Sequence, residues 1–404
     1  MRVLLVHGRY RSVAPSGENN VVDQEAAALR EAGHEVALFQ RHSDEIAGWS
    51  FAQKAALPAR TLWNAPVRHD LARRLAESRP DVVHVHNTFP LLSPAVLFAC
   101  RDADVPVVAT IHNYKLLCAS GDFFRDGSPC HDCAGGRVSP AVVHGCYRGS
   151  RAATLPVVAS LTLHRSSWQR LVSAYIFISA AQRDLMSGLG LPADRVFVKH
   201  NFVPPRDPRD GEAGHMVVYL GRLDAAKGVP LLMRSWDVFR RRNPDSALRL
   251  AVAGGGPLDE TVRRWAAGHT TVDVHGLLDS DEAAGLLRRA VAAVVPSQWE
   301  ETFGLVAVEA MRAGVAPIAP ARGSFPELVT DGDDGALFTP GDPDALARAF
   351  EDVDTDPERY LELGRCGRTT YEKRFSRAAN LDELLTVYEF AVGNPAGSRR
   401  HVPS

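Results

Sequence analysis

Short apolar runs rich in Val, Ile and Leu alternate along the chain with longer segments of helical period. Apolar runs of strand length are typical of a parallel sheet that is covered on both faces. The chain is therefore predicted to be an α/β protein. The expected strands are 2–7, 35–39, 81–86, 107–111, 175–179 and 196–199, with a helix at 22–32, and in the second half 216–220, 248–253, 271–275, 292–296, 315–318 and 336–338.

The chain has 404 residues, and single hydrophobic cores stop growing near about 250–300 residues. Residues 203–214 combine prolines, glycines and charges without an apolar face, so they are expected to be a linker. The linker separates two doubly wound, Rossmann-like domains, whose ligand crevices lie at the carboxyl ends of the strands and are expected to face a common cleft. The expected parts are a domain at 1–202 with a cysteine-rich insertion at 118–146, the linker 203–214, a domain at 215–392 with a terminal helix, and a tail at 393–404.

Composition and charge narrow the range of partners. The net charge of −2 and the pI near 6.7 give no global field that would attract nucleic acid. No apolar segment reaches the 18 or more residues of a transmembrane helix, and the N-terminus has the form of a strand rather than a signal peptide. We therefore expect a cytoplasmic protein without a transmembrane segment or nucleic-acid partner. Peripheral membrane association and the oligomeric state stay open.

The segment 296–310 is expected to be a loop that follows a strand and opens a helix at about Phe303. Glu301 lies in this loop and Glu309 lies in the helix. At 1.5 Å per residue they are at most about 12 Å apart, close enough to hold parts of one ligand. The amides of Phe303, Gly304 and Leu305 are expected to face an anion at the helix start. The alternative is a surface helix with two solvated glutamates.

A second motif, Gly-Arg-Leu-Asp-Ala-Ala-Lys-Gly, spans residues 221–228 just beyond the expected strand 216–220. Arg222 offers a planar fork of donors and Lys227 offers a compact charge, a pair suited to a departing diphosphate. An ordinary basic turn is the alternative.

Two further features belong to the first half of the chain. Gly17 follows the first strand and precedes a helix, where a glycine lets the backbone pass close to a phosphate or sugar. His112 stands at the carboxyl end of a strand, where a ligand-facing polar side chain is expected. A purely structural histidine is the alternative there.

As a set, these residues resemble the glycosyltransferase group 1 superfamily of retaining GT-B enzymes, which includes relatives of sucrose synthase and bacterial mannosyltransferases. The resemblance covers most of the chain and also includes 33–36, 81–86, Ser179, 254–257 and 323–327. It implies a nucleoside-diphosphate sugar as co-substrate and an acceptor hydroxyl on a lipid carrier, a glycan or a small natural product. It also implies catalysis that needs no metal or other cofactor.

The resemblance also implies roles for individual residues. Arg222 and Lys227 would bind the donor diphosphate, Glu309 the ribose and Glu301 the transferred sugar, while His112 would face the reacting sugar. Glu300 stands beside Glu301, and the spacing to Glu309 selects Glu301. The implied catalytic residues are His112, Glu301, Arg222 and Lys227, and the implied donor-binding residues are Gly17, Gly221, Arg222, Lys227, Gly254, Phe303, Gly304, Leu305 and Glu309.

Four cysteines, Cys118, Cys130, Cys133 and Cys146, form a cluster with a central Cys-x-x-Cys spacing. This spacing suits a structural zinc, which would fix a loop that looks too polar to pack unaided. Free thiols and disulfides are the alternatives, and a cytosolic compartment disfavours disulfides. Because the cluster follows His112, it is expected to shape an acceptor pocket.

The aromatic residues Trp49, Phe51 and Trp63 are expected to pack in a core or, as the alternative, to form an acceptor platform. A GT-B fold alone does not fix the chemistry, so a nucleotide-sugar epimerase, a phosphorylase-like enzyme and a silent sugar-nucleotide binder are the competing functions. An epimerase needs no acceptor, and a silent binder does not turn the donor over.

Overall fold

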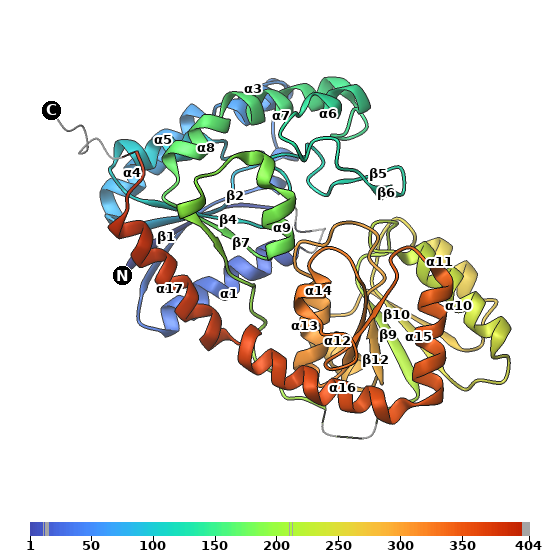
Figure 1. Cartoon of the computed structure of the whole chain (residues 1–404). Helices are drawn as coiled ribbons and strands as arrows, with labels where there is room; N and C mark the ends of the chain where they lie inside the picture. The colour runs from blue at the N-terminus through green and yellow to red at the C-terminus, as the bar shows by residue number, and fades with distance from the viewer. Residues whose placement is uncertain (11, 13–15, 210, 212, 398–404) are drawn as a thin grey trace. The chain divides into compact units, whose positions relative to one another are not determined.

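The computed structural model describes residues 1–10, 12, 16–209, 211 and 213–397. The chain divides into a first unit, made of residues 1–123, 130–200 and 380 onward, and a second unit, made of residues 124–129 and 201–379. Each unit contains a six-stranded parallel sheet with helices on both faces (Figure 1). The predicted α/β class with two Rossmann-like units is therefore confirmed.

The first sheet has the strand order β2-β1-β3-β4-β7-β8. Its strands are β1 (Arg2–Arg9), β2 (Glu35–His42), β3 (Val82–Asn87), β4 (Val107–Ile111), β7 (Ala174–Phe177) and β8 (Val196–Val198). The helices of this unit are α1 (Gly17–Glu31), α2 (Phe51–Ala55), α3 (Leu57–Leu62), α4 (Ala65–Ser78), α5 (Ala95–Asp102), α6 (Ser139–His144), α7 (Arg151–Leu163), α8 (Arg165–Leu171), α9 (Ala180–Leu185) and α17 (Arg377–Gly393), with 3₁₀ turns at Ser43–Ile46, Ser187–Leu189 and Ala193–Arg195.

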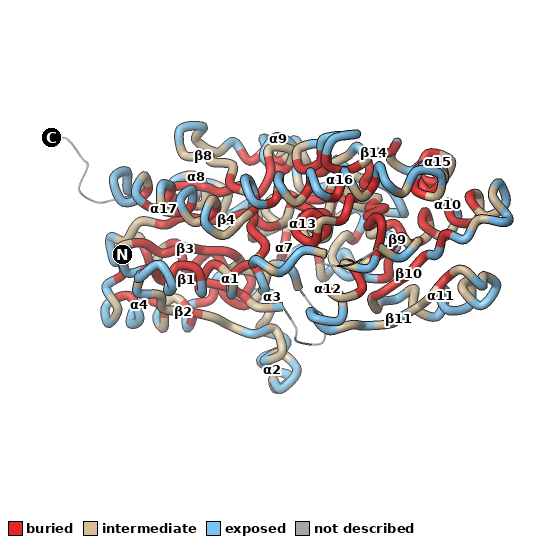
Figure 2. The backbone as a smooth tube through the Cα atoms, turned by 90° about the horizontal axis from the view of Figure 1, so that it is seen from below, coloured by how far each residue is buried: buried red, intermediate tan, exposed pale blue. Residues whose placement is uncertain are grey.

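Alternation along β1 builds a core on each face of the first sheet. Leu4 and Val6 belong to one buried cluster, while Val3 and Leu5 belong to another that includes Leu384 of α17. Successive side chains of a strand point to opposite faces, so one buried strand supplies both cores. Figure 2 shows this burial along β1 and β3.

The second sheet has the strand order β11-β10-β9-β12-β13-β14. Its strands are β9 (Met216–Leu220), β10 (Arg249–Ala253), β11 (Val272–Gly276), β12 (Ala292–Val294), β13 (Ala316–Pro320) and β14 (Ala336–Phe338). The helices are α10 (Val229–Arg242), α11 (Asp259–Ala266), α12 (Ser280–Arg288), α13 (Leu305–Ala313), α14 (Phe325–Leu328), α15 (Pro343–Thr355) and α16 (Pro357–Thr370), followed by a π-helix at Tyr371–Phe375.

Each expected strand corresponds to an observed one, with bounds that differ by at most three residues. Helix α1 starts earlier than expected, at Gly17 rather than residue 22. A short antiparallel hairpin, β5 (Phe124–Arg125) and β6 (Ser128–Pro129), was not expected. Its turn is Asp126-Gly127, with φ values of 54° and 82°, as in the tight turns that favour this dipeptide.

Two domain boundaries differ from the expected ones. The terminal helix was assigned to the second domain, but α17 belongs to the first unit from Asn380 onward, where Tyr388 is fully buried. The start of the expected linker 203–214 is bound to the second unit, because the Tyr371 hydroxyl donates to the Val203 carbonyl at 3.0 Å. Residues 210 and 212 of the linker, and 398–404 of the expected tail, lie outside the described residues.

The aromatic segment around α2 and α3 is mostly outside the core. Phe51 is 89% exposed at the start of α2, which is exposed in Figure 2. Trp63 is 37% exposed and stacks on His164 with ring centroids 6.0 Å apart. The expectation of core packing is therefore wrong for Phe51.

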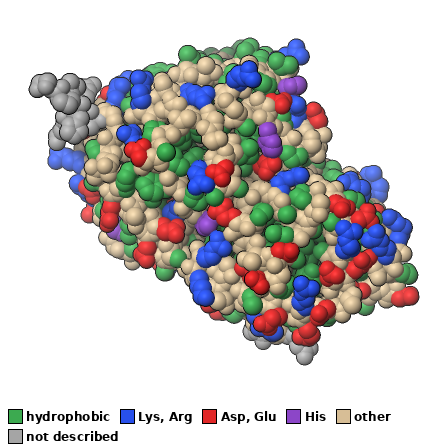
Figure 3. Space-filling model, in the orientation of Figure 1, with side chains coloured by type: hydrophobic (Ala, Val, Ile, Leu, Met, Phe, Trp, Pro, Cys, Tyr) green, Lys and Arg blue, Asp and Glu red, His purple; other side chains and the backbone are tan. Residues whose placement is uncertain are grey.

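The molecular surface agrees with the near-neutral composition. Figure 3 shows Lys and Arg side chains interspersed with Asp and Glu on the visible face. Among the helices of the described residues, none has the length and apolar character needed to cross a membrane.

Candidate functional site

The loop that follows β9 carries the two cations of the expected diphosphate clamp. The Arg222 side chain is 69% exposed, and its Nε donates to the Asp224 carboxylate. Asp224 Oδ1 also accepts from the Lys227 amide at 2.8 Å, so this buried carboxylate fixes the loop and orients Arg222. The sequence analysis did not assign Asp224, although it lies inside the same motif.

Lys227 and Glu301 come together in the second unit. Lys227 Nζ lies 3.0 and 2.9 Å from the two oxygens of Glu301, and 4.8 Å from the centroid of the Trp299 ring. Glu301 Oε2 also accepts from Ser297 Oγ at 3.0 Å and from Trp299 Nε1 at 2.8 Å. These donors hold the largely buried carboxylate in one orientation. Ser297 and Trp299 were also missed, because their roles appear only when the loop is folded.

Glu309 lies on α13, which begins two residues later than expected. Gly304 has a φ of 84°, so regular helix starts at Leu305 rather than Phe303. The Phe303 side chain is 2% exposed, and it therefore offers a ligand its backbone rather than its ring. Burial raises the pKa of Glu309 above 4.5, while the nearby charges of Arg312 and Arg206 oppose this shift.

Glycines at the ends of β9 and β10 allow a close approach of two backbone segments. Gly254 has a φ of 145°, and a Cβ there would lie 1.8 Å from the Gly221 carbonyl oxygen. Gly228 has a φ of 78°, and a Cβ there would lie 1.7 Å from the Pro296 carbonyl oxygen. Side chains at these positions would push the loop away from the strand ends.

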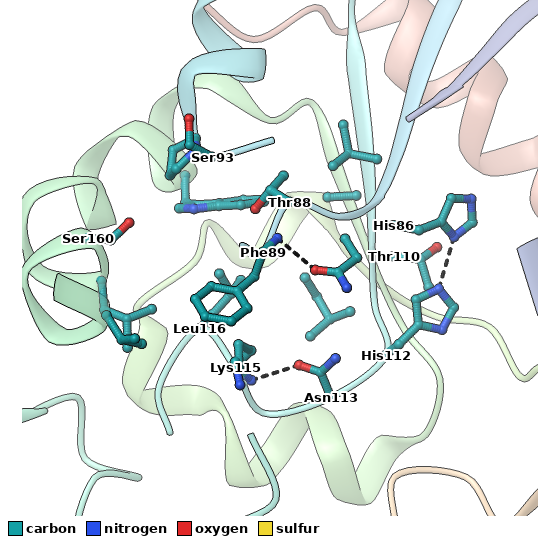
Figure 4. Close-up of a pocket in the computed structure, with 18 of the residues that line it drawn as sticks. His86, Thr88, Phe89, Ser93, Thr110, His112, Asn113, Lys115, Leu116 and Ser160 are labelled. Carbon is teal, nitrogen blue, oxygen red and sulfur yellow. Dashed lines mark hydrogen bonds between the residues drawn. The ribbon is translucent and has the colours of Figure 1, made fainter. Parts of the chain in front are cut away.

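His112 follows β4 in the first unit and is 8% exposed. Its Nε2 lies 2.9 Å from His86 Nδ1, and the two rings stack (Figure 4). Burial lowers the pKa of both histidines well below 6.5. Both residues line a cavity of about 70 Å³, which has room for a few waters or a small polar group.

Glu18, next to the expected ligand residue Gly17, lies in the same unit. Gly17 is exposed as the first residue of α1, whereas the Glu18 side chain is 9% exposed. Glu18 Oε2 accepts from Asn113 Nδ2 at 3.0 Å and from the Tyr10 hydroxyl at 3.3 Å. Burial raises the pKa of Glu18 to about 7. This carboxyl therefore titrates near neutral pH.

The cysteine cluster does not form the expected zinc site. Cys118, Cys130, Cys133 and Cys146 form no disulfide, and no three of their sulfurs lie within 4.8 Å of one another among the described residues. Phe123 is buried inside this segment together with Cys118 and Cys133, so the expectation that the loop is too polar to pack unaided is wrong. Burial and the other three cysteines raise the pKa of Cys133 to about 11.

The fold has counterparts among solved glycosyltransferases. The structure of Anabaena HepE in complex with UDP and glucose aligns with a TM-score of 0.66 at 17% identity, covering 96% of this chain and 99% of that one. Sucrose-phosphate synthase from Thermosynechococcus elongatus aligns with a TM-score of 0.65 at 20% identity, covering 96% and 98%. The two units together therefore have the GT-B fold.

Sequence comparison identifies the family. The model of glycosyl transferases group 1 matches residues 206–370, and that of glycosyltransferase family 4 matches residues 15–207. Mycobacterium tuberculosis glycogen synthase is 28% identical, over 96% of this chain and 94% of the relative. Phosphatidyl-myo-inositol mannosyltransferase of Mycolicibacterium smegmatis is 26% identical, over 95% and 92%. The chain belongs to the glycosyltransferase group 1 superfamily, and it is a glycosyltransferase.

Proposed function

We propose that the protein is a retaining glycosyltransferase that moves a sugar from a nucleoside-diphosphate sugar to an acceptor hydroxyl. The observation that carries this proposal is the arrangement in the second unit. Lys227 Nζ donates to both oxygens of Glu301, and Glu309, whose pKa is raised by burial, lies on α13 of the same unit. A cation beside one carboxylate, with a second carboxylate nearby in sequence, suits a ligand that carries both a diphosphate and hydroxyl groups.

Each of these residues has a separate task in the proposed reaction. Arg222 and Lys227 stabilise the charge that develops on the diphosphate as the bond between sugar C1 and the phosphate oxygen breaks. The acceptor oxygen forms its bond to C1 on the same face, and its proton passes to the departing phosphate oxygen. Glu309 binds the ribose hydroxyls, and Glu301 binds hydroxyls of the transferred sugar. No carboxylate nucleophile and no metal takes part.

The first unit supplies His112, which binds the reacting sugar, and the acceptor pocket. The relatives guide the choice of substrates to test. The HepE complex contains UDP and glucose, and other relatives are named as mannosyltransferases and glycogen synthases. UDP-glucose and GDP-mannose are therefore the first donors to assay, with a glucan and phosphatidylinositol as the first acceptors.

Two measurements test the function. The first is thermal unfolding with UDP, GDP, ADP or dTDP, because a ligand at 100 times its Kd stabilises the native state by about 2.7 kcal/mol. We expect one nucleotide to raise Tm clearly more than the others. The second is product analysis by NMR with the matching donor and an acceptor, where we expect a new glycosidic bond with the donor's anomeric configuration.

The same assay separates the alternatives. An altered free sugar formed without acceptor would indicate an epimerase. Nucleotide binding without donor turnover would indicate a silent binder. An inverted product would contradict the retaining mechanism.

A further inference from the structure

A continuous line of buried polar side chains leads to His112 within the first unit. Lys199 Nζ lies 3.0 Å from Glu25 Oε1, and Glu25 Oε2 lies 3.5 Å from His86 Nε2. His86 Nδ1 then lies 2.9 Å from His112 Nε2. The side chains of Lys199 and Glu25 are 2% exposed, and that of His86 is fully buried. None of the residues behind His112 was assigned a role by the sequence analysis.

The charged end of this line fixes Glu25 as a hydrogen-bond acceptor. Lys199 Nζ donates to Glu25 Oε1 and, at 2.9 Å, to Asn380 Oδ1. The ion pair with the Lys199 ammonium makes the oxygens of the Glu25 carboxylate hydrogen-bond acceptors. An ionised carboxylate has no proton to donate, so any group that faces Glu25 Oε2 must be a donor.

The contact between Glu25 and His86 determines where the ring proton of His86 lies. Glu25 Oε2 and His86 Nε2 are both buried and have no hydrogen-bond partner among the described residues. Leaving both unpaired is unfavourable, because each atom gives up its hydrogen bonds to water on folding. With its proton on Nε2, the His86 ring is attracted to the carboxylate oxygen 3.5 Å away, whereas a lone pair on that nitrogen would be repelled by it.

The proton position on His86 determines the proton position on His112. Burial keeps both histidines neutral, so each carries a single ring proton. With its proton on Nε2, His86 presents Nδ1 as an acceptor, and His112 must donate from Nε2. The Nδ1 atom of His112 is then an unprotonated acceptor.

A metal ion is the competing explanation for the buried cluster, because ligand atoms of Glu25, His84 and His86 lie within 4.8 Å of one another. The Lys199 ammonium already neutralises Glu25, which disfavours a second cation there. Both nitrogens of His84 are also engaged, Nδ1 with the Tyr388 hydroxyl at 2.8 Å and Nε2 with Thr110 Oγ1 at 2.7 Å. The cluster therefore fits a hydrogen-bond chain better than a metal site.

We propose that Glu25 and His86 are positioning residues that hold His112 as the neutral Nε2–H tautomer, so that His112 Nδ1 accepts a hydrogen bond from a hydroxyl of the donor sugar. The proposal rests on the proposed function, which assigns His112 to the reacting sugar. The reverse tautomer would present a proton at Nδ1 and could not accept that bond. In general, a hydrogen-bond partner at one ring nitrogen of a histidine fixes its tautomer and the orientation of its ring.

The wild-type protein provides the first test. Nitrogen-15 NMR of histidine-labelled protein distinguishes protonated from unprotonated ring nitrogens, and single substitutions of His86 and His112 assign their signals. We expect protonated Nε2 and unprotonated Nδ1 in both residues. A proton on Nδ1 of His112 would overturn the proposal. This measurement needs no substrate, so it is independent of whether the proposed function is correct.

Glu25→Gln provides the second test. Lys199 can still donate to the amide carbonyl, which directs the new amide NH₂ at His86 Nε2 and makes that atom an acceptor. The protons of His86 and His112 should then both move to Nδ1. We expect kcat with UDP-glucose or GDP-mannose, whichever the wild type uses, to fall about tenfold to hundredfold, the usual effect of one mismatched buried hydrogen bond.

Binding of the free nucleotide distinguishes a change in the His112 tautomer from a general loss of the folded binding site. UDP and GDP lack the transferred sugar, whose hydroxyl is the proposed partner of His112, so their affinity should stay within about twofold of wild type in Glu25→Gln. Glu31→Gln, an exposed position on the same helix, is the matched control and should keep wild-type kcat and tautomers. Reversed tautomers with unchanged kcat would overturn the proposal. If Glu25→Gln does not fold, the wild-type spectrum still decides the tautomer.

Discussion

The ionisable side chains of the two units differ in their exposure to solvent. In the second unit, the cations keep access to solvent: the side chain of Arg222 is 69% exposed and that of Lys227 31% exposed. In the first unit, the corresponding strand ends hold buried groups, and burial lowers the pKa of His86 and His112 well below 6.5. Accessible charges attract a charged ligand, whereas buried neutral groups fix the direction of hydrogen bonds. In the proposed function, the accessible cations of the second unit bind the diphosphate and the buried groups of the first unit bind uncharged hydroxyl groups.

Lys227→Ala is the strongest test of the accessible cations in the second unit. Glu301 would keep its bonds to Ser297 and Trp299, so the fold should survive, but the leaving diphosphate would lose a cation. We expect kcat/KM to fall about 100- to 1,000-fold, as for the loss of one preorganised donor at a developing charge. Lys373→Ala, at an exposed lysine of the same unit, should retain wild-type activity. Activity within about threefold of wild type in Lys227→Ala would remove Lys227 from the site.

Glu18→Gln probes the cost of a buried charge in the first unit. Burial raises the pKa of Glu18 from 4.5 to about 7, so the folded state holds this proton more tightly than the unfolded state. Stability from this group is therefore complete below about pH 4.5 and is lost as the pH rises through 7. The shift corresponds to about 3 kcal/mol above pH 7.

Replacement by a neutral amide removes this cost. Glu18→Gln should be more stable than wild type by about 3 kcal/mol at pH 8 and should match it near pH 4, measured by denaturant unfolding across that range. Glu31→Gln on the same helix should show no such pH-dependent gain. Equal stability of Glu18→Gln and wild type at every pH would show that Glu18 is not desolvated.

Glu309→Gln tests whether the second unit uses charge in nucleoside binding as well. The proposed function assigns this carboxylate to the ribose hydroxyls, so its contribution should appear in ligand binding. Replacing charge-assisted bonds to the ribose by neutral ones should weaken binding of the matching nucleoside diphosphate about 5- to 30-fold, the equivalent of about 1–2 kcal/mol. Calorimetric titration measures this, with Glu260→Gln at an 80% exposed position as the control. An unchanged Kd would exclude the ribose role.

The contrast between the units also explains how far the sequence could be interpreted. The strands were predictable because apolar runs mark them locally, and Arg222 and Lys227 could be singled out because they lie within one eight-residue motif. The line from Lys199 through Glu25 and His86 to His112 joins residues up to 174 positions apart. No spacing rule connects them, since only the parallel sheet and α1 bring them together.

The cysteines show the limit of a spacing argument. The interval between Cys130 and Cys133 matches a metal-binding motif, but the sulfur positions depend on Phe123 and the other apolar residues that bury the segment. The unit to which α17 belongs could not be predicted from the sequence for a related reason. Its helical pattern is clear in the sequence, but which sheet it covers depends on tertiary packing around Tyr388.

Thiol reactivity gives the smallest expected effect and extends the comparison to the cysteines. Cys366 of the second unit is exposed, whereas burial raises the pKa of Cys100 to about 12 and that of Cys133 to about 11 in the first unit. The thiolate is the reactive form, so iodoacetamide at pH 8 should modify Cys366 first and these two buried thiols last. Peptide mass spectrometry over time measures the order, and Cys366→Ser should remove the fast phase. A chelator should leave the slow labelling of Cys133 unchanged, because burial protects its sulfur. Fast labelling of Cys118, Cys130, Cys133 and Cys146 after chelation would instead show that a bound metal protects them.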